Sequence, residues 1–208
     1  MLTSKILSEF IDDVSSNSPA PGGGSVSALC GALGSALTAM VCRLTIGKKN
    51  YEGVQDEMLA TLGQADELRA KLTGLIDRDT EAFNLVMKAF TLPKTTDDEK
   101  RIRSEAIQTA TKQATLVPLE VMKLCEQAMG IAATVAERGN VNSITDAGVA
   151  GLILKAGCEG AALNVQINLA TLKDKTFVDE TSTLVSALLT NVEAVSDRIR
   201  QRVQAVLS

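Results

Sequence analysis

The chain has no histidine, so acid–base chemistry must use Asp, Glu, Lys, Tyr or Cys side chains with shifted pKa values. Asp77, Asp79 and Glu81 stand close together before an apolar stretch. Asp79 falls on the stripe of neighbouring apolar residues, so we expect a partly buried carboxyl whose pKa is raised by desolvation and which can carry a proton. The alternative is a set of solvated acids, although Asp77 and Glu81 share a helical face and repel each other there.

A loop of small residues is the second candidate site. Residues Pro21, Gly22, Gly23, Gly24 and Ser25 precede a long apolar segment, which places bare backbone amides at the positive end of a helix. Such a loop can bind an anion or let a flat ring approach the backbone; a tight turn is the alternative. A Walker-type nucleotide loop is excluded, because no Gly-Lys-Ser/Thr follows and no strand precedes.

Two lysines and a tyrosine, Lys48, Lys49 and Tyr51, follow the end of that apolar segment. Paired lysines at a helix end are usually solvated, or offset the negative end of the helix dipole. Tyr51 is the only tyrosine of the chain. It could stack on a ring or donate a hydrogen bond to a ligand.

A polar loop precedes the second long apolar segment. Ser143 followed three residues later by Asp146 is typical of a capping box, with Asp in place of Glu. The functional alternative places Asp146 in the first turn of a buried helix beside a ligand, with Asn140 and Asn142 donating amide hydrogen bonds. The two interpretations are compatible.

A pair of asparagines, Asn164 and Asn168, lies one turn apart in an otherwise apolar segment, so both share one helical face. Buried amides need hydrogen-bond partners. Another helix or the polar edge of a bound ring could supply them.

The elements that must position these residues are helices. Hydrophobic residues make up 45% of the chain but aromatic residues only 2%, which favours close-packed helices over a sandwich. Helical periodicity is expected over residues 2–14, 25–45, 54–90, 96–117, 119–137, 143–172 and 177–206. Pro118 predicts a kink or a break between the fourth and fifth of these segments. We therefore predict an all-α fold: a single-domain antiparallel helical bundle of residues 1–208, with two small-residue central helices and no sheet.

Residues 25–45 and 143–172 are apolar on all sides and rich in Gly and Ala. A small bundle buries one such helix easily and two with difficulty. Pairing of two chains would cover the surplus apolar surface, so we expect a homodimer.

Charge and cysteine content exclude several classes. The net charge of −4 argues against a nucleic-acid partner. Cys30, Cys42, Cys125 and Cys158 are widely spaced, so we expect reduced, mostly buried thiols and no metal site. With no signal peptide, the expected location is the cytoplasm. No membrane span is expected, since the most apolar run, residues 26–44, is rich in Gly, Ser and Thr.

The order of these motifs carries a resemblance that spans nearly the whole chain. They are the Pro-x-Pro-Gly-Gly-Gly-Ser run at 19–25, the segment 44–51, the acidic segment 77–83, Gly139-Asn140 with Ser143 and Asp146, and the segment 164–169. Together they resemble the cyclodeaminase/cyclohydrolase family of folate enzymes. The resemblance implies an all-helical, dimeric fold and a tetrahydrofolate one-carbon derivative as substrate, with no additional cofactor.

The resemblance also implies roles for the polar residues. Lys48 or Lys49 would hold the anionic glutamate tail of folate, and Asn164 and Asn168 would bond the pterin edge. Asp79 would move protons during the reaction. Asp146 would stabilise a cationic amidine.

Two reactions fit such a site. A cyclohydrolase adds water to the methenyl carbon between the two folate nitrogens and opens the ring to formyltetrahydrofolate. A cyclodeaminase closes a formimino group and releases ammonia. A formiminotransferase domain is not expected, since one helical domain uses up the chain, and we favour the stand-alone cyclohydrolase. The alternative of another class is a non-catalytic folate-binding helical dimer.

Overall fold

The computed structural model describes residues 1–208, and its regular elements are helices without any strand. The α-helices are α1 (Leu7–Ser15), α2 (Gly23–Thr45), α3 (Gln55–Phe90), α4 (Asp97–Arg138), α5 (Ile144–Leu169) and α6 (Lys175–Leu207). Short 3-10 turns are η1 (Leu2–Ser4), η2 (Glu52–Val54) and η3 (Val141–Ser143). The predicted all-α fold without a sheet is confirmed.

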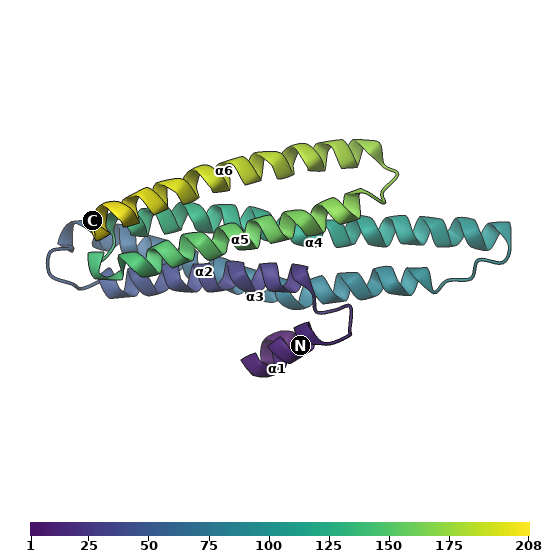
Figure 1. Ribbon diagram of the computed structural model, residues 1–208, viewed down its shortest axis with the longest axis horizontal. Coiled ribbons are helices and arrows are strands. Elements are labelled where there is room, and N and C mark those ends of the chain that lie inside the picture. The colour runs from purple at the N-terminus through teal and green to yellow at the C-terminus, as the bar shows by residue number, and fades with distance from the viewer.

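Five long helices lie side by side along one axis, and α1 lies apart beside the bundle (Figure 1). Helix α4 contacts α2, α3, α5 and α6. Around it the other helices follow the order α3, α2, α5, α6, because α2 packs on α3 and α5, and α5 packs on α6. The successive helices α2 to α6 run antiparallel to one another, as predicted.

Glycines allow the central helices to approach closely. A Cβ at Gly31 would lie 2.8 Å from both the Cys125 sulfur and a Leu72 methyl group. A Cβ at Gly157 on α5 would lie 2.9 Å from the backbone oxygen of Ser27 on α2. These contacts are too short for any side chain, so the small-residue composition of α2 and α5 is required by their packing.

Helix α4 differs from the prediction of a kink or break at Pro118. The structure has one continuous helix with Pro118 inside it, rather than two helices. Proline removes one N–H from the helical ladder, but both flanking turns are anchored in the core through residues such as Thr115 and Met122. Burial of these turns outweighs the lost bond. The α4 N-terminus carries a capping box between Thr96 and Glu99.

The capping box predicted for Ser143 and Asp146 is wrong. Ser143 is the N-cap of α5 but its side chain makes no capping hydrogen bond. The turn η3 precedes α5 directly, so the backbone of Ser143 continues a helical turn instead of the extended geometry that a capping box needs.

The N-terminal segment differs from the single helix expected over 2–14. It forms the turn η1 followed by α1, and in α1 only Phe10 is buried. Ile6 and Leu7 are 65% and 66% exposed. The apolar face of α1 is thus left largely uncovered by its own chain.

Helices α2 and α5 are buried on their inner sides but exposed on their outer sides, rather than buried all round. On α5, Leu152, Leu163 and Ile167 are more than 60% exposed. By length and composition α2 could cross a membrane, but 61% of its most apolar stretch is buried in the bundle. Burial of that kind is also found in the core helices of water-soluble proteins.

The cysteines match the expectation of free thiols. Cys42, Cys125 and Cys158 are buried, Cys30 is half-buried, and none forms a disulfide. Burial raises the pKa of Cys158 to about 12, so this thiol is unreactive near neutral pH.

Candidate active site

The glycine loop and Asp79 meet at the N-terminus of α2. Gly22 is the N-cap of α2 and offers no side-chain cap. The carboxylate of Asp79, from the neighbouring helix α3, lies in this place, and the Ser25 hydroxyl donates to its Oδ2 atom at 3.1 Å. A Cβ at Gly24 would overlap this carboxylate. Gly24 therefore permits an acid from another helix to cap α2.

Asp79 has the perturbed acidity expected of an acid–base group. Burial raises its pKa above the ordinary value, and hydrogen bonds from the side chain and backbone of Ser25 offset only part of this effect. The carbonyl oxygen of Ile76 lies 2.9 Å from the same Ser25 hydroxyl, so the single hydroxyl proton is shared between this carbonyl and Asp79. A positioned carboxyl that protonates more readily than a surface acid suits proton transfer.

Asp79 opens into a cleft of about 290 Å³. Phe83 and Val86 follow Asp79 at helical spacing and line the same cleft. The full lining comprises Pro19, Ala20, Gly22, Gly23, Gly24, Asp79, Phe83, Val86, Ala114, Pro118, Asn164, Ile167 and Asn168. The site thus combines one carboxyl, two amides and an apolar wall with an aromatic ring.

The amides of Asn164 and Asn168 both line this cleft, on the shared helical face that their spacing predicted. Asn164 donates its Nδ2 group to the Gly160 carbonyl at 2.8 Å. The same nitrogen would lie 3.4 Å from a Cβ at Gly23, so Asn164 packs on the glycine loop. Its carbonyl oxygen and the Asn168 amide have no partner within the chain and can bond a ligand.

A backbone acceptor also lies in the cleft. Pro118 has no N–H, so the carbonyl of Ala114 lacks its usual helical donor. Both residues line the cleft.

The remaining predicted residues lie at the opposite end of the bundle. Because α2 and α5 are antiparallel, the end of α2 meets the start of α5: the Asn140 amide donates to the Leu44 carbonyl at 2.8 Å. Ser25 and Leu44 are 19 residues apart on α2, which corresponds to about 30 Å along the helix. Lys48, Lys49, Tyr51, Asn140, Asn142 and Asp146 are therefore far from Asp79 within one chain.

Several polar groups at that end are used internally. The Asn140 backbone donates to the Thr45 hydroxyl at 2.8 Å, and its side-chain oxygen accepts from the Asn142 backbone at 3.1 Å. The Tyr51 hydroxyl accepts from the Val141 backbone at 2.9 Å. Asn140 and Tyr51 thus hold the turn η3 against the end of α2.

Lys48 and Lys49 are different, since both are exposed and neither forms an ion pair within the chain. They follow Gly47, whose φ of +73° ends α2 in the left-handed conformation expected of a C′ glycine. Asp146 is half-buried in the first turn of α5.

Comparison with known proteins decides the family. A profile described as formiminotransferase-cyclodeaminase matches residues 6–187. The chain belongs to this family. It is 44% identical over 205 residues to the methenyltetrahydrofolate cyclohydrolase of Methylorubrum extorquens, with 99% of each chain covered.

Other members of the formiminotransferase-cyclodeaminase family are larger. The chain is 36% identical over 183 residues to the formimidoyltransferase-cyclodeaminase of Rattus norvegicus and spans 34% of its length. Among solved structures, the formiminotetrahydrofolate cyclodeaminase of Thermotoga maritima matches over 100% of both chains, with a TM-score of 0.90 and 31% identity. The predicted family resemblance is confirmed.

The structure shows five cleft-lining residues that were not among the site residues predicted from the sequence. Phe83, Val86, Ala114, Pro118 and Ile167 line the cleft. Helical spacing from Asp79 could have identified Phe83 and Val86. A proline inside a helix leaves a carbonyl without its helical donor, which could have identified Ala114 and Pro118. Ile167 gives no signal in the sequence beyond lying between two asparagines.

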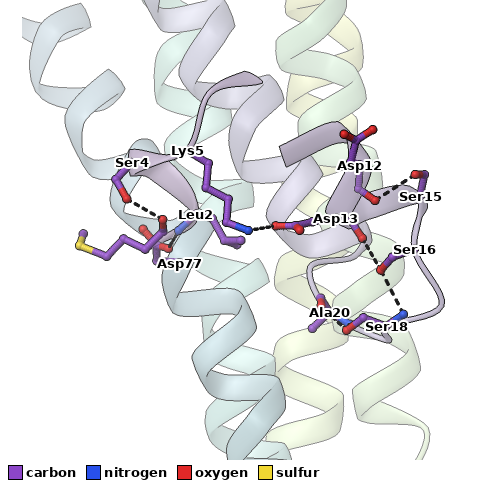
Figure 2. A network of polar contacts seen from close by, with 11 residues as sticks. Leu2, Ser4, Lys5, Asp12, Asp13, Ser15, Ser16, Ser18, Ala20 and Asp77 are labelled. Carbon is purple, nitrogen blue, oxygen red and sulfur yellow. Dashed lines mark hydrogen bonds and ion pairs between the residues drawn. The ribbon is translucent and has the colours of Figure 1, made fainter. Parts of the chain in front are cut away.

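Asp77 proves to anchor the N-terminal segment. The Leu2 backbone donates to Asp77 Oδ1 (Figure 2). The Thr3 hydroxyl donates to Asp77 Oδ2 at 2.7 Å. Burial acts to raise the pKa of Asp77, but these hydrogen bonds outweigh it and hold that pKa below its ordinary value. Asp77 is thus an ionised structural acid, two residues from Asp79 but outside the cleft.

The other cavities offer less chemistry. One of about 290 Å³ lies beneath α1, lined mainly by apolar residues that include Phe10, Leu29 and Leu33. Another of about 310 Å³ lies between α5 and α6 around Val149 and Ile199. Neither contains a carboxylate. Two further cavities do, one of about 260 Å³ around Glu57 and Glu137 and one of about 800 Å³ around Glu159 and Glu193, but all four carboxylates are paired with Arg or Lys side chains. The glycine-loop cleft contains a desolvated carboxyl without an ion-pair partner and is therefore the candidate active site.

Proposed function

We propose that this protein is a methenyltetrahydrofolate cyclohydrolase whose active site is the glycine-loop cleft. The observation that carries the proposal is the Asp79 carboxyl, held at the start of α2 with a raised pKa inside a cleft that also contains two amides. A relative that is 44% identical over its full length and bears that enzyme name supports the choice of reaction.

Asp79 can serve both proton-transfer steps. Water adds to the cationic methenyl carbon and gives one proton to Asp79, which forms a neutral carbinolamine. Asp79 then returns this proton to a folate nitrogen as the bond between that nitrogen and the one-carbon unit breaks. The hydroxyl proton leaves to the solvent, and formyltetrahydrofolate is released. A carboxyl with a raised pKa suits both directions of transfer.

The rest of the cleft would bind the pterin. Asn164 and Asn168 would bond its polar edge, Phe83 would pack on the ring, and the Ala114 carbonyl would accept from a ring N–H. The reaction needs no cofactor besides the tetrahydrofolate substrate.

A formiminotetrahydrofolate cyclodeaminase is the second candidate, because the T. maritima protein of that name has the same fold over its whole length. There a folate nitrogen attacks the formimino carbon and ammonia leaves. The same carboxyl could transfer the proton that ammonia needs.

We further propose that the enzyme works as a homodimer in the cytoplasm, without a nucleic-acid or membrane partner. The exposed apolar sides of α2 and α5 support dimerisation. The buried free thiols fit a cytoplasmic location. The net charge of −4 fits the absence of a nucleic-acid partner.

The test is an absorbance assay of the pure protein with each folate. A cyclohydrolase consumes methenyltetrahydrofolate faster than the buffer does. A cyclodeaminase produces methenyltetrahydrofolate from formiminotetrahydrofolate and releases ammonia. Binding without turnover of either compound would identify the non-catalytic alternative and contradict the proposal.

A further inference from the structure

The Ser25 hydroxyl is buried behind the glycine-loop cleft rather than exposed in it. Ser25 is 0% exposed, and it is not among the residues that line the cleft. A ligand in the cleft can reach the Asp79 carboxyl but not this hydroxyl. Ser25 is therefore not the ligand contact that its place in the loop predicted, and its influence on a reaction must pass through a neighbouring group.

Three oxygen atoms surround the Ser25 hydroxyl. The Ile76 carbonyl lies at 2.9 Å, the Oδ2 atom of Asp79 at 3.1 Å and the Thr80 hydroxyl at 3.3 Å. A serine hydroxyl donates one proton and can accept two hydrogen bonds. Its proton can therefore serve either Ile76 or Asp79 at one moment, while its oxygen accepts from another group.

Thr80 is placed to be the donor to this oxygen. The other two threonines of α3, Thr61 and Thr73, donate to the carbonyl of the preceding turn at 2.8 and 2.7 Å. The corresponding carbonyl for Thr80 is that of Ile76, which accepts from Ser25 instead. Ser25 Oγ is the one hydrogen-bond partner of the Thr80 hydroxyl, so this hydroxyl can support Ser25 as a donor.

These contacts satisfy Asp79 in both of its protonation states. When the carboxyl is ionised, Ser25 donates to Oδ2 and accepts from Thr80. When Oδ2 carries a proton, that proton is donated to the Ser25 oxygen, and the Ser25 hydroxyl turns to the Ile76 carbonyl. A buried polar group without a partner is costly. Rotation of one hydroxyl avoids that cost in both states.

No ion pair fixes Asp79 in one state. It is the only charged residue in the cleft lining, to which α2, α4 and α5 contribute uncharged residues alone. On α3, Asp77 is bonded to the N-terminal segment, Glu81 is exposed and Arg78 is paired with a carboxylate of α4. Burial raises the pKa of Asp79, and the bonds from Ser25 act against this rise. Ser25 is thus the polar group that controls this carboxyl.

We propose that Ser25 is a positioning residue for proton transfer: its hydroxyl, supported by Thr80, donates to Asp79 when that carboxyl is ionised and turns to the Ile76 carbonyl when it is protonated. The Ser25 proton stays on its own oxygen throughout. Asp79 keeps one position in the cleft while it gains and loses the reacting proton. The reaction that uses this proton rests on the proposed function, whereas the coupling of Ser25 to Asp79 does not.

The pH profile of Ser25→Ala tests the coupling in the enzyme. The ionised carboxyl loses one donor, so the acidic limb of the kcat profile should move up by about one pH unit, which corresponds to a roughly tenfold lower kcat below the limb. KM above the limb should stay at the wild-type value, because Ser25 does not touch folate. A raised KM with an unmoved limb would show a ligand contact and overturn the proposal.

Thr80 and Ser35 provide matched variants. Thr80→Val removes the supporting hydroxyl and should move the limb in the same direction by a smaller amount, whereas Thr80→Ser keeps the hydroxyl and should leave the profile unchanged. Ser35→Ala is the control, since Ser35 is also 0% exposed on α2 and donates to the Gly31 carbonyl at 3.0 Å. It should lower stability without moving the limb. An equal movement in Ser35→Ala would reduce the effect to a general loss of stability and contradict the proposal.

A titration without folate separates failure of this inference from failure of the proposed function. Carbon-13 NMR of the aspartate carboxyl groups, with Asp79→Asn to assign the signal, reports the pKa of Asp79 in the pure protein. This pKa should be higher in Ser25→Ala than in the wild type. An unchanged pKa would overturn the inference whatever the kinetics show. A raised pKa in a protein that turns over neither folate would uphold the coupling and contradict the proposed function.

Discussion

The two ends of the bundle contain similar residue types but use them differently. At the lysine end, Asn140 and Tyr51 are occupied by bonds to the backbone of α2 and η3. At the glycine-loop end, the Asn168 amide and the side-chain oxygen of Asn164 belong to a cleft and have no intramolecular partner. Hydrogen bonds that are already made identify a structural end, and groups left free in a cleft identify a ligand-binding end.

Two acids on one turn of α3 are also distinguished by their hydrogen-bond partners. Asp77 accepts bonds from the N-terminal segment, and its pKa is lowered despite burial. Asp79 is more deeply buried with fewer donors, and burial raises its pKa. Residue type alone does not separate the two; their partners do.

The largest effect is expected from Asp79→Asn. Loss of the proton carrier should lower kcat about a hundredfold or more, while folate binding is kept. The melting temperature near neutral pH should stay equal or rise, because a carboxylate with a raised pKa is disfavoured by the fold. Steady-state kinetics and calorimetry check both parts, and near-normal turnover would remove Asp79 from the mechanism.

The second effect concerns Gly24→Ala, which introduces a Cβ into the space of the Asp79 carboxylate. Displacement of this group should lower kcat about tenfold or more and destabilise the protein by about 1–3 kcal/mol. Gly63→Ala on α3 is the control, since nothing lies within 4 Å of its Cβ. That change should stabilise the protein by roughly 1 kcal/mol and leave kcat unchanged. Equal kinetics for the two variants would show that the close approach at Gly24 is unimportant.

The third effect should follow from replacing either Lys48 or Lys49 by Ala. If these lysines hold the glutamate tail, the rise in KM should be greater for polyglutamylated than for monoglutamylated folate. A lost charge-assisted hydrogen bond of about 1.5–3 kcal/mol corresponds to a rise of about tenfold or more. Equal rises for both substrates would exclude the lysines from that role.

A smaller effect is expected from Asp146→Asn. The side chain lies in the first turn of α5, at the lysine end, and reaches a cleft only in a homodimer that brings the two ends together. Binding and turnover should then both weaken about severalfold through loss of a charge that stabilises the cationic substrate. Kinetic constants that match the wild type would leave Asp146 without a part in the reaction.

The smallest effect is a change in how stability depends on pH. Because the pKa of Asp79 is raised above 3.8 in the folded protein, the folded state binds more protons than the unfolded state between these two pKa values. Stability contributed by this group is therefore lost as pH rises through the folded pKa. Urea unfolding of wild type and Asp79→Asn from about pH 4 to pH 8 should show this slope in the wild type only. A slope of opposite sign would mean that the carboxylate is stabilised by its cap.

Much of this architecture is predictable from the sequence, because helical periodicity and punctuation are local. Gly47 ends α2 and Thr96 begins α4 as expected. The continuity of α4 through Pro118 was not predictable, since it depends on burial of both flanking turns by other helices. The missing capping box at Ser143 likewise depends on the turn that precedes it.

The candidate site was predictable only as a set of residues. Asp79, Gly24 and Asn164 come together because α2, α3 and α5 meet at one end, which no local pattern specifies. The sequence grouped Asp146 with Asp79, but the direction of α5 places them at opposite ends of the chain. Spatial separation of this kind follows from topology and not from residue type.

A crystal structure with a bound, unreactive folate tests the central claim most directly. We expect the pterin in the glycine-loop cleft, within hydrogen-bond distance of Asp79 and Asn164. A pterin bound between Tyr51 and Asn140 of one chain, with the glycine-loop cleft empty, would contradict the account.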